Sequence, residues 1–364
     1  MLPWAELNRI LEQHRLEPPR LRLTREGQPV PASGFLDYQT NRRRSGQPIP
    51  RLRAQDLAEQ LRNGATLVLD AVDELYAPVT ALAENLEREF HVYVQVNAYA
   101  GWQTSHGFDL HWDDHDVFIV QVAGRKQWKV YGMTRRYPLA RDVEPADDPP
   151  TEPLWEGLLR EGDLLYIPRG WWHVATPLGE PTLHLTVGIS NPTGAEFLSW
   201  FVDRLRESEE VRRDLPRFAP PEQQAVYSER LRTLLANAWS PDLMRQFLDE
   251  LDARAQPRAR IGLPWTATLA VLPVDATAYR VRWSGARPLS IQRDDAAGEI
   301  TVDANGRRWR FAAAAEPILK LLASGHPCSK TEVYAVCHGI PAATVDAFLK
   351  ELVVNGLAVL LPGT

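Results

Sequence analysis

The sequence predicts a mostly β core, followed by a helical region and a smaller C-terminal domain. Residues 117–122 form an apolar run that fits a strand buried on both faces, and the turn at Ala123-Gly124 leads into a second strand with period-two alternation. Residues 182–189 alternate polar and apolar side chains in the same way. After residue 193 the apolar residues instead recur at helical spacing. A β-barrel core with helices after it accounts for these patterns.

A candidate metal site begins at the start of this core. His111 and Asp113 are two residues apart, so on a strand both side chains point to the same face. The best third ligand is His173, which follows a Pro-Arg-Gly turn. Two histidines and one carboxylate are typical of non-haem Fe(II) oxygenases, whereas zinc sites more often use three histidines or thiolates. The alternative is a surface His-x-Asp pair, which is the commoner origin of so short a motif.

A buried lysine favours the metal site over the surface pair. Lys126 shares a strand face with Trp128 and Val130, and a charged amine on an apolar face costs several kcal/mol unless an anion meets it. In residues 182–189 the polar face carries His184 and Thr186. We expect this face to line a cavity rather than meet solvent, because the neighbouring strands read as interior. A threonine hydroxyl beside an ammonium suits a carboxylate of a small diacid.

At this level of detail the chain resembles a known family, the JmjC-type ribosomal oxygenases, and in particular a bacterial member. The resemblance is closest over about residues 60 to 195 and rests on five elements in order: Asn97-Ala98-Tyr99, Ser105-His106-Gly107-Phe108, His111-Trp112-Asp113-Asp114, the run from Val117 to Trp128, and the run from Gly162 to His173. The resemblance implies a double-stranded β-helix of the cupin or jelly-roll type, the JmjC barrel. A helical dimerisation region and a winged-helix-like C-terminal domain are expected to follow.

The resemblance also implies an activity and its residues. Proteins of this family are Fe(II)- and 2-oxoglutarate-dependent dioxygenases that use O2 to hydroxylate a histidine or arginine side chain of a ribosomal protein. By resemblance, the iron ligands are His111, Asp113 and His173, and the 2-oxoglutarate contacts are Lys126, Thr186, Asn97 and Tyr99. Lysine at position 126 looks more like the branch that hydroxylates histidine. Compared with many relatives, the chain is expected to lack an N-terminal lead segment.

Four domains are predicted: 1–55, an N-terminal helix and extended segment; 56–192, the catalytic barrel; 193–258, the helical dimerisation region; and 259–364, the winged-helix-like domain. Because apolar stripes continue through 193–258 outside the barrel, we expect a homodimer through these helices, with packing inside one chain as the alternative.

Shorter elements are assigned from local pattern. Helices are expected at 1–20, 56–62, 78–90, 317–323, 330–337 and 342–354, and strands at 266–272, 279–283 and 357–361. Residues 21–53 read as an extended segment with a solvated basic cluster at 42–44. Residues 131–161 are rich in proline and acidic residues, which predicts a loop over the barrel mouth where a client could be recognised or which could be inert.

Composition narrows the cellular setting. The net charge of −6 is a poor match to generic nucleic-acid binding but attracts basic clients such as ribosomal proteins. Residues 342–354 contain one lysine and two acids, so we expect no direct DNA binding. The two cysteines, Cys328 and Cys337, have no metal-site spacing, which favours a reduced, cytoplasmic location. We expect neither a signal peptide nor a membrane span.

Other functions remain compatible with these patterns. The same chemistry could act on a biosynthetic peptide or a tRNA base. A non-catalytic metal-binding cupin with a regulatory winged helix would also carry the His-x-Asp pair, but it would not need Lys126.

Overall fold

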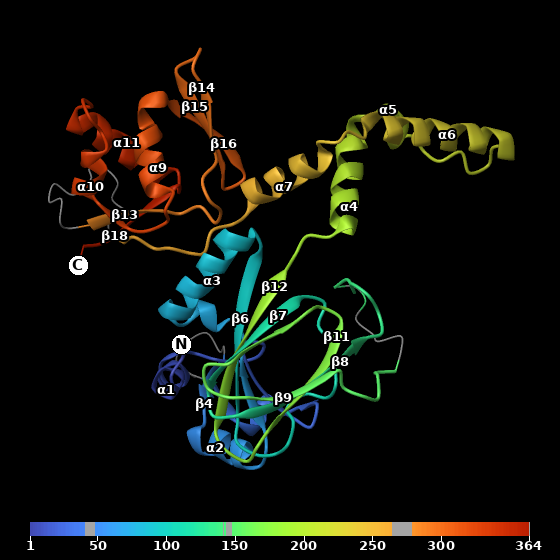
Figure 1. Ribbon diagram of the computed structural model, residues 1–364, viewed down its shortest axis with the longest axis vertical. Coiled ribbons are helices and arrows are strands. Elements are labelled where there is room, and N and C mark those ends of the chain that lie inside the picture. The colour runs from blue at the N-terminus through green and yellow to red at the C-terminus, as the bar shows by residue number, and fades with distance from the viewer. Residues whose placement is uncertain (41–47, 141, 143–147, 264–278, 364) are drawn as a thin grey trace. The chain divides into compact units, whose positions relative to one another are not determined.

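The computed structural model describes residues 1–40, 48–140, 142, 148–263 and 279–363 (Figure 1). The chain divides into two compact units, Met1–Asn191 and Pro192–Thr364. The predicted basic cluster at 42–44 and the predicted strand at 266–272 lie outside the described residues. The finer division into four domains stays a prediction.

The first unit is built on a seven-stranded sheet whose paired strands are all antiparallel. In spatial order its strands are β10 (Leu164–Ile167), β7 (Asp116–Ala123), β12 (Thr182–Ser190), β6 (Tyr93–Gly101), β5 (Thr66–Leu69), β1 (Leu21–Arg25) and β2 (Gln28–Pro29). Because β1 pairs with β5, residues 21–25 belong to this sheet. The sequence predicted only an extended segment for these residues and did not predict the strand.

A smaller sheet faces the first one. Its order is β11 (Trp171–Pro177), β8 (Lys126–Met133) and β9 (Trp155–Leu159). Val117 and Ile119 of the large sheet share a buried cluster with Trp128 and Val130 of the small sheet, so the two sheets pack across a common interior. Strand β9 was not expected, because it lies in the proline-rich stretch 131–161 that was read as a loop. With these two sheets the predicted mostly β, cupin-type core is confirmed.

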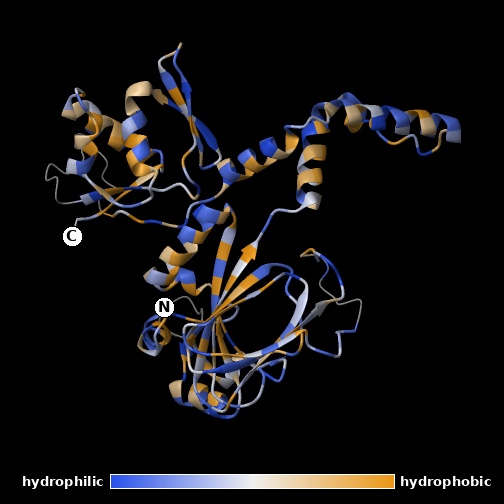
Figure 2. Ribbon diagram, viewed as in Figure 1, coloured by the Kyte–Doolittle hydropathy of each residue, from blue (hydrophilic) through white to orange (hydrophobic). Residues whose placement is uncertain are grey.

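Helices cover the outer face of the large sheet. Helices α1 (Trp4–Gln13) and α3 (Ala77–Phe90) share one hydrophobic core with the odd-numbered residues 183–189 of β12. In Figure 2 hydrophobic and hydrophilic residues alternate along the strands of the large sheet. The even-numbered residues 182–186 therefore point to the barrel interior, as their alternation predicted. Helix α2 (Ala54–Arg62) and the hairpin of β3 (Leu36–Thr40) with β4 (Pro48–Leu52) complete this unit.

The second unit begins with four helices: α4 (Gly194–Arg204), α5 (Glu209–Arg212), α6 (Pro221–Ala238) and α7 (Leu243–Arg254). Thr193 caps α4 in a capping box with Glu196, which fixes where the helix starts. Phe197 of α4 and Phe247 of α7 pack in a small core. In contrast, α6 buries none of its 18 residues in the described chain.

The described residues of the C-terminal part form two small sheets and three helices. The sheets are β17 (Cys328–Ser329), β13 (Tyr279–Trp283) and β18 (Ala358–Pro362), and β14 (Ile291–Asp294), β15 (Glu299–Ala304) and β16 (Arg307–Ala312). The helices are α9 (Glu316–Leu322), α10 (Lys330–Ala335) and α11 (Ala342–Val354). Three helices closed by a strand match the predicted winged-helix-like arrangement. Among the described residues, none of the helices has the length and apolar character needed to cross a membrane.

Candidate active site

Two histidines from distant segments meet through their backbones. His111 and His173 form an isolated antiparallel bridge in which the His173 N–H donates to the His111 carbonyl at 2.7 Å and the His111 N–H donates to the His173 carbonyl at 3.2 Å. Residues paired in this way put their side chains on one side of the sheet. The two imidazole centroids therefore lie 4.4 Å apart.

Asp113 completes a group of three. The Gly170 N–H donates to the Asp113 carbonyl at 2.8 Å, which ties the segment after His111 to the turn before His173. Asp113 Oδ2 lies 3.5 Å from His173 Nε2. One ligand atom from each of the three side chains lies within 4.8 Å of the others, and within the described ranges no other group of His, Cys, Asp and Glu side chains meets that test. The structure thus brings the three predicted iron ligands together.

The hydrogen bonds of the two imidazoles suit metal binding. Nδ1–H of His111 donates to the Asp109 carbonyl at 2.7 Å, and Nδ1–H of His173 donates to the Trp171 carbonyl at 3.0 Å. With each Nδ1 engaged in a hydrogen bond, Nε2 is the nitrogen that each ring can offer to a metal. Burial, together with the nearby His111, lowers the pKa of His173 to about 4, so this ring is neutral at physiological pH. Two imidazoles that offer Nε2 and a carboxylate fit a divalent first-row metal.

The three residues open into a cavity of about 210 Å³ between the sheets. Lys126 lines it and is only 6% exposed. Among the described residues its ammonium has no hydrogen-bond or ion-pair partner, and it lies 5.6 Å from the centroid of the Trp128 ring. Burial lowers the pKa of Lys126 to about 7. A buried amine in this state is a ready site for an anion.

The other predicted co-substrate contacts fall into two groups. Thr186 and Tyr99 line the same cavity, and burial raises the pKa of the Tyr99 phenol, which keeps it protonated. Asn97 does not line the cavity: its Oδ1 accepts from the Ala71 N–H at 2.9 Å and from Gln95 Nε2 at 3.0 Å. The structure therefore gives Asn97 a part in holding the backbone at Ala71, outside the lining of the cavity.

Among the cavity residues to which sequence reasoning gave no role are two buried ring residues, His184 and Trp128. Both line the cavity and are 3% exposed. Both residues lie on the inward face of strands that alternate with period two. That alternation is the sequence signal that could have identified them as cavity residues. Two further histidines near the site form pairs outside the group of three: His115 with Asp114 at 2.9 Å, and His106 with Asp109 at 3.0 Å.

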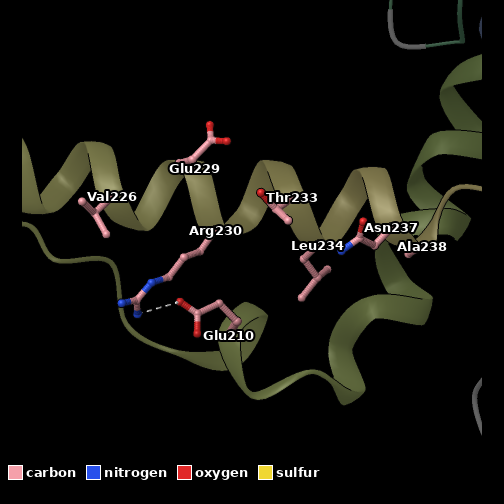
Figure 3. A pocket seen from close by; sticks show the side chains of 8 residues that line it. All are labelled: Glu210, Val226, Glu229, Arg230, Thr233, Leu234, Asn237 and Ala238. Carbon is pink, nitrogen blue, oxygen red and sulfur yellow. Dashed lines mark ion pairs between the residues drawn. The ribbon is translucent and has the colours of Figure 1, made fainter.

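A larger hollow lies along α6, but its lining lacks the side chains expected of an active site. It measures about 710 Å³ and is lined by residues of α5 and α6 (Figure 3). Arg230 and Glu210 form a partly exposed ion pair across it at 3.7 Å. The described residues that line it include no histidine or cysteine. The barrel cavity is therefore the candidate active site.

Comparisons with known proteins agree with this choice. Residues 71–197 match the JmjC domain family. Ribosomal oxygenase 2 of Rattus norvegicus is 44% identical over 119 residues, which are 32% of this chain and 24% of that protein. A bifunctional lysine-specific demethylase and histidyl-hydroxylase NO66 of Drosophila persimilis is 36% identical over 107 residues, 29% of this chain and 16% of that protein. The matches thus span a quarter or less of these relatives.

A solved structure resembles nearly the whole chain. The ribosomal oxygenase YcfD of Escherichia coli, in complex with cobalt and 2-oxoglutarate, covers 98% of this chain and 90% of its own, with a TM-score of 0.53 and 19% sequence identity. At that identity the match establishes the fold alone.

Proposed function

We propose that this chain, whose residues 71–197 form a domain of the JmjC family, is an Fe(II)- and 2-oxoglutarate-dependent dioxygenase that hydroxylates a protein side chain. One observation carries the proposal: a His-Asp-His group and a buried, unpartnered lysine line the same cavity. A metal-binding group by itself would not need the lysine. A dicarboxylate that bridges metal and ammonium explains both.

Each residue has a physical task in this proposal. Nε2 of His111, Nε2 of His173 and the Asp113 carboxylate would hold the iron. Lys126 neutralises the distal carboxylate of 2-oxoglutarate, and the Thr186 hydroxyl donates to it. Tyr99 bounds the cavity, while Asn97 supports the backbone beside it. The iron would supply the activation of O2: one oxygen atom enters succinate as 2-oxoglutarate loses CO2, and the other becomes the hydroxyl group of the client.

We infer a basic ribosomal protein as the client and a histidine as the hydroxylated residue. The similarity to ribosomal oxygenase 2 and to a histidyl-hydroxylase supports this client class. The net charge of −6 supports it independently, because an acidic protein attracts a basic one at long range.

Turnover of 2-oxoglutarate is the direct test. We expect the purified protein with Fe(II) and ribosomal protein extract to form succinate, and intact-mass spectra to show one client gaining a single oxygen atom. His111→Ala should abolish both, because the metal loses a ligand. The proposal fails if succinate formation in wild type does not exceed that of His111→Ala. A metal-bound protein that leaves 2-oxoglutarate intact would instead be a non-catalytic cupin, and a gain of oxygen on tRNA or a small peptide would change only the client.

We also propose a homodimer through the helical region. Helix α6 buries no residue within its chain, and an isolated helix of this length is marginal in water. Val226 on α6 and Met244 on α7 are 54% and 60% exposed, which leaves apolar surface for a second copy. Analytical ultracentrifugation should give a dimer for wild type and a monomer for Val226→Asp. The matched control Ser228→Asp, at an exposed position on the opposite face of α6, should stay dimeric.

A further inference from the structure

His184 is a polar residue of the cavity to which the proposed function gives no task. It lies in β12, paired in register with Tyr99 of β6 on one side and Gln121 of β7 on the other. Its side chain reaches the cavity that Lys126 also lines. The common explanation for a buried histidine is a structural role in which both ring nitrogens have hydrogen-bond partners.

Two aromatic contacts fix the orientation of this ring. The imidazole stacks on the Tyr99 ring at 5.0 Å with planes 7° apart, and it meets the Trp128 ring edge-on at 5.5 Å and 85°. A ring held between two such neighbours cannot turn out of its plane without losing both contacts. The plane of the ring is therefore set before any ligand binds.

The nitrogens of His184 are not satisfied by the protein. Nδ1 is sealed from solvent and has no partner among the described residues. Nε2 likewise has no described partner but is not sealed, which leaves it facing the cavity. A sealed lone pair costs less than a sealed N–H, so the proton belongs on Nε2. Burial, and then the charge of Lys126, lower the pKa of His184 well below its ordinary value, so the ring stays neutral.

We propose that His184 is a further binding residue for the acidic co-substrate, whose distal carboxylate accepts a hydrogen bond from Nε2–H while Lys126 neutralises its charge. Both residues contact the Trp128 ring, at 5.5 Å for His184 and 5.6 Å for the Lys126 ammonium, so they serve the same end of the cavity. An ammonium attracts a carboxylate without orienting it, whereas an N–H in a fixed ring also sets its direction. This inference rests on the proposed use of 2-oxoglutarate.

The tautomer can be measured without any turnover. In wild-type protein loaded with Zn²⁺ and labelled with ¹⁵N-histidine, correlation spectra should show His184 as a neutral ring protonated at Nε2. Adding 2-oxoglutarate should move the Nε2–H resonance downfield, because the proton enters a hydrogen bond to an anion. A ring protonated at Nδ1, or a resonance that does not move when 2-oxoglutarate binds, would overturn the inference.

Binding to variants separates hydrogen bonding from shape. His184→Phe keeps the stack on Tyr99 but removes the N–H, so calorimetry on the Zn²⁺-loaded protein should show 2-oxoglutarate binding about tenfold more weakly. His184→Gln restores an N–H donor and should recover most of the loss. The matched control His338→Phe, at an exposed position of the second unit, should bind as wild type does.

The outcomes distinguish this inference from the proposed function. If wild type binds 2-oxoglutarate and His184→Phe binds it equally well, only the role of His184 is refuted. If wild type does not bind 2-oxoglutarate at all, both the proposed function and this inference are refuted. If His184→Phe does not fold, the spectra of the wild-type protein decide.

Discussion

Replacing Lys126 with methionine should make the protein more stable while it destroys co-substrate binding. The folded protein holds this ammonium in the cavity without a described partner, and burial lowers its pKa from 10.5 to about 7. The unfolded chain therefore binds the proton more tightly than the folded one does. Stability is lost as the pH falls from 10.5 towards 7, and the loss is complete below about pH 7. At pH 7 the gap in pKa corresponds to about 4 kcal/mol.

Methionine has a similar length and no charge, so Lys126→Met removes this cost. Urea unfolding of the metal-loaded protein without 2-oxoglutarate should give a free energy of unfolding up to about 4 kcal/mol higher for the variant at pH 7. The difference should shrink as the pH rises to about 9, because the wild-type amine is then uncharged in the folded state. In calorimetry the variant should bind 2-oxoglutarate at least about a hundredfold more weakly, since a charged partner is gone.

Lys129→Met is the matched control, because Lys129 lies on the other face of β8, where it is half-exposed and 3.5 Å from Glu156. An exposed pair of this kind contributes little, so its stability should change by less than about 1 kcal/mol. A variant Lys126→Met that is less stable than wild type, or whose advantage does not depend on pH, would refute the reasoning. Either result would mean that the folded protein already compensates the charge.

Two further predictions concern pH and the turn before His173. The affinity for 2-oxoglutarate should fall as the pH rises above about 7, because free Lys126 must then take up a proton to bind an anion; calorimetry in buffers of different ionisation enthalpy measures that uptake, and an affinity independent of pH would contradict it. Asp116→Ala should cost about 2 kcal/mol and weaken metal binding, because Asp116 accepts from the Arg169 N–H at 3.1 Å, from the Tyr166 hydroxyl at 3.0 Å and from Asn191 at 3.0 Å. Denaturant unfolding and metal titration test this against the exposed Asp295→Ala.

The grouping of the candidate site's side chains could be predicted in part from the sequence, and local periodicity explains why. His111 and Asp113 share a face because strand geometry alone puts residues two apart together, and the inward position of Lys126 follows from the same rule. The bridge between His111 and His173 is a long-range contact, which spacing could only make plausible. Strand β9 could not be predicted because the composition around it is irregular and rich in proline. Its residues form a strand because they pair with β8, a contact that local composition does not reveal. Asn97 lies two residues from Tyr99, so strand alternation predicts that both side chains point inward. The Asn97 side chain instead accepts a hydrogen bond from Ala71, a residue far away in sequence, and does not line the cavity.

The cavity gathers polar groups that lack a partner among the described residues. The Lys126 ammonium and His184 Nε2 have no hydrogen-bond partner there, and they line the same cavity as the His-Asp-His group. A dicarboxylate that reaches from a bound metal to these two groups would partner them, so the metal and the dicarboxylate should bind cooperatively. His184 lies on β12, whose opposite face packs under helices, and this packing fixes the register of the strand that carries it. The groups without partners are thus the ones expected to hold the dicarboxylate.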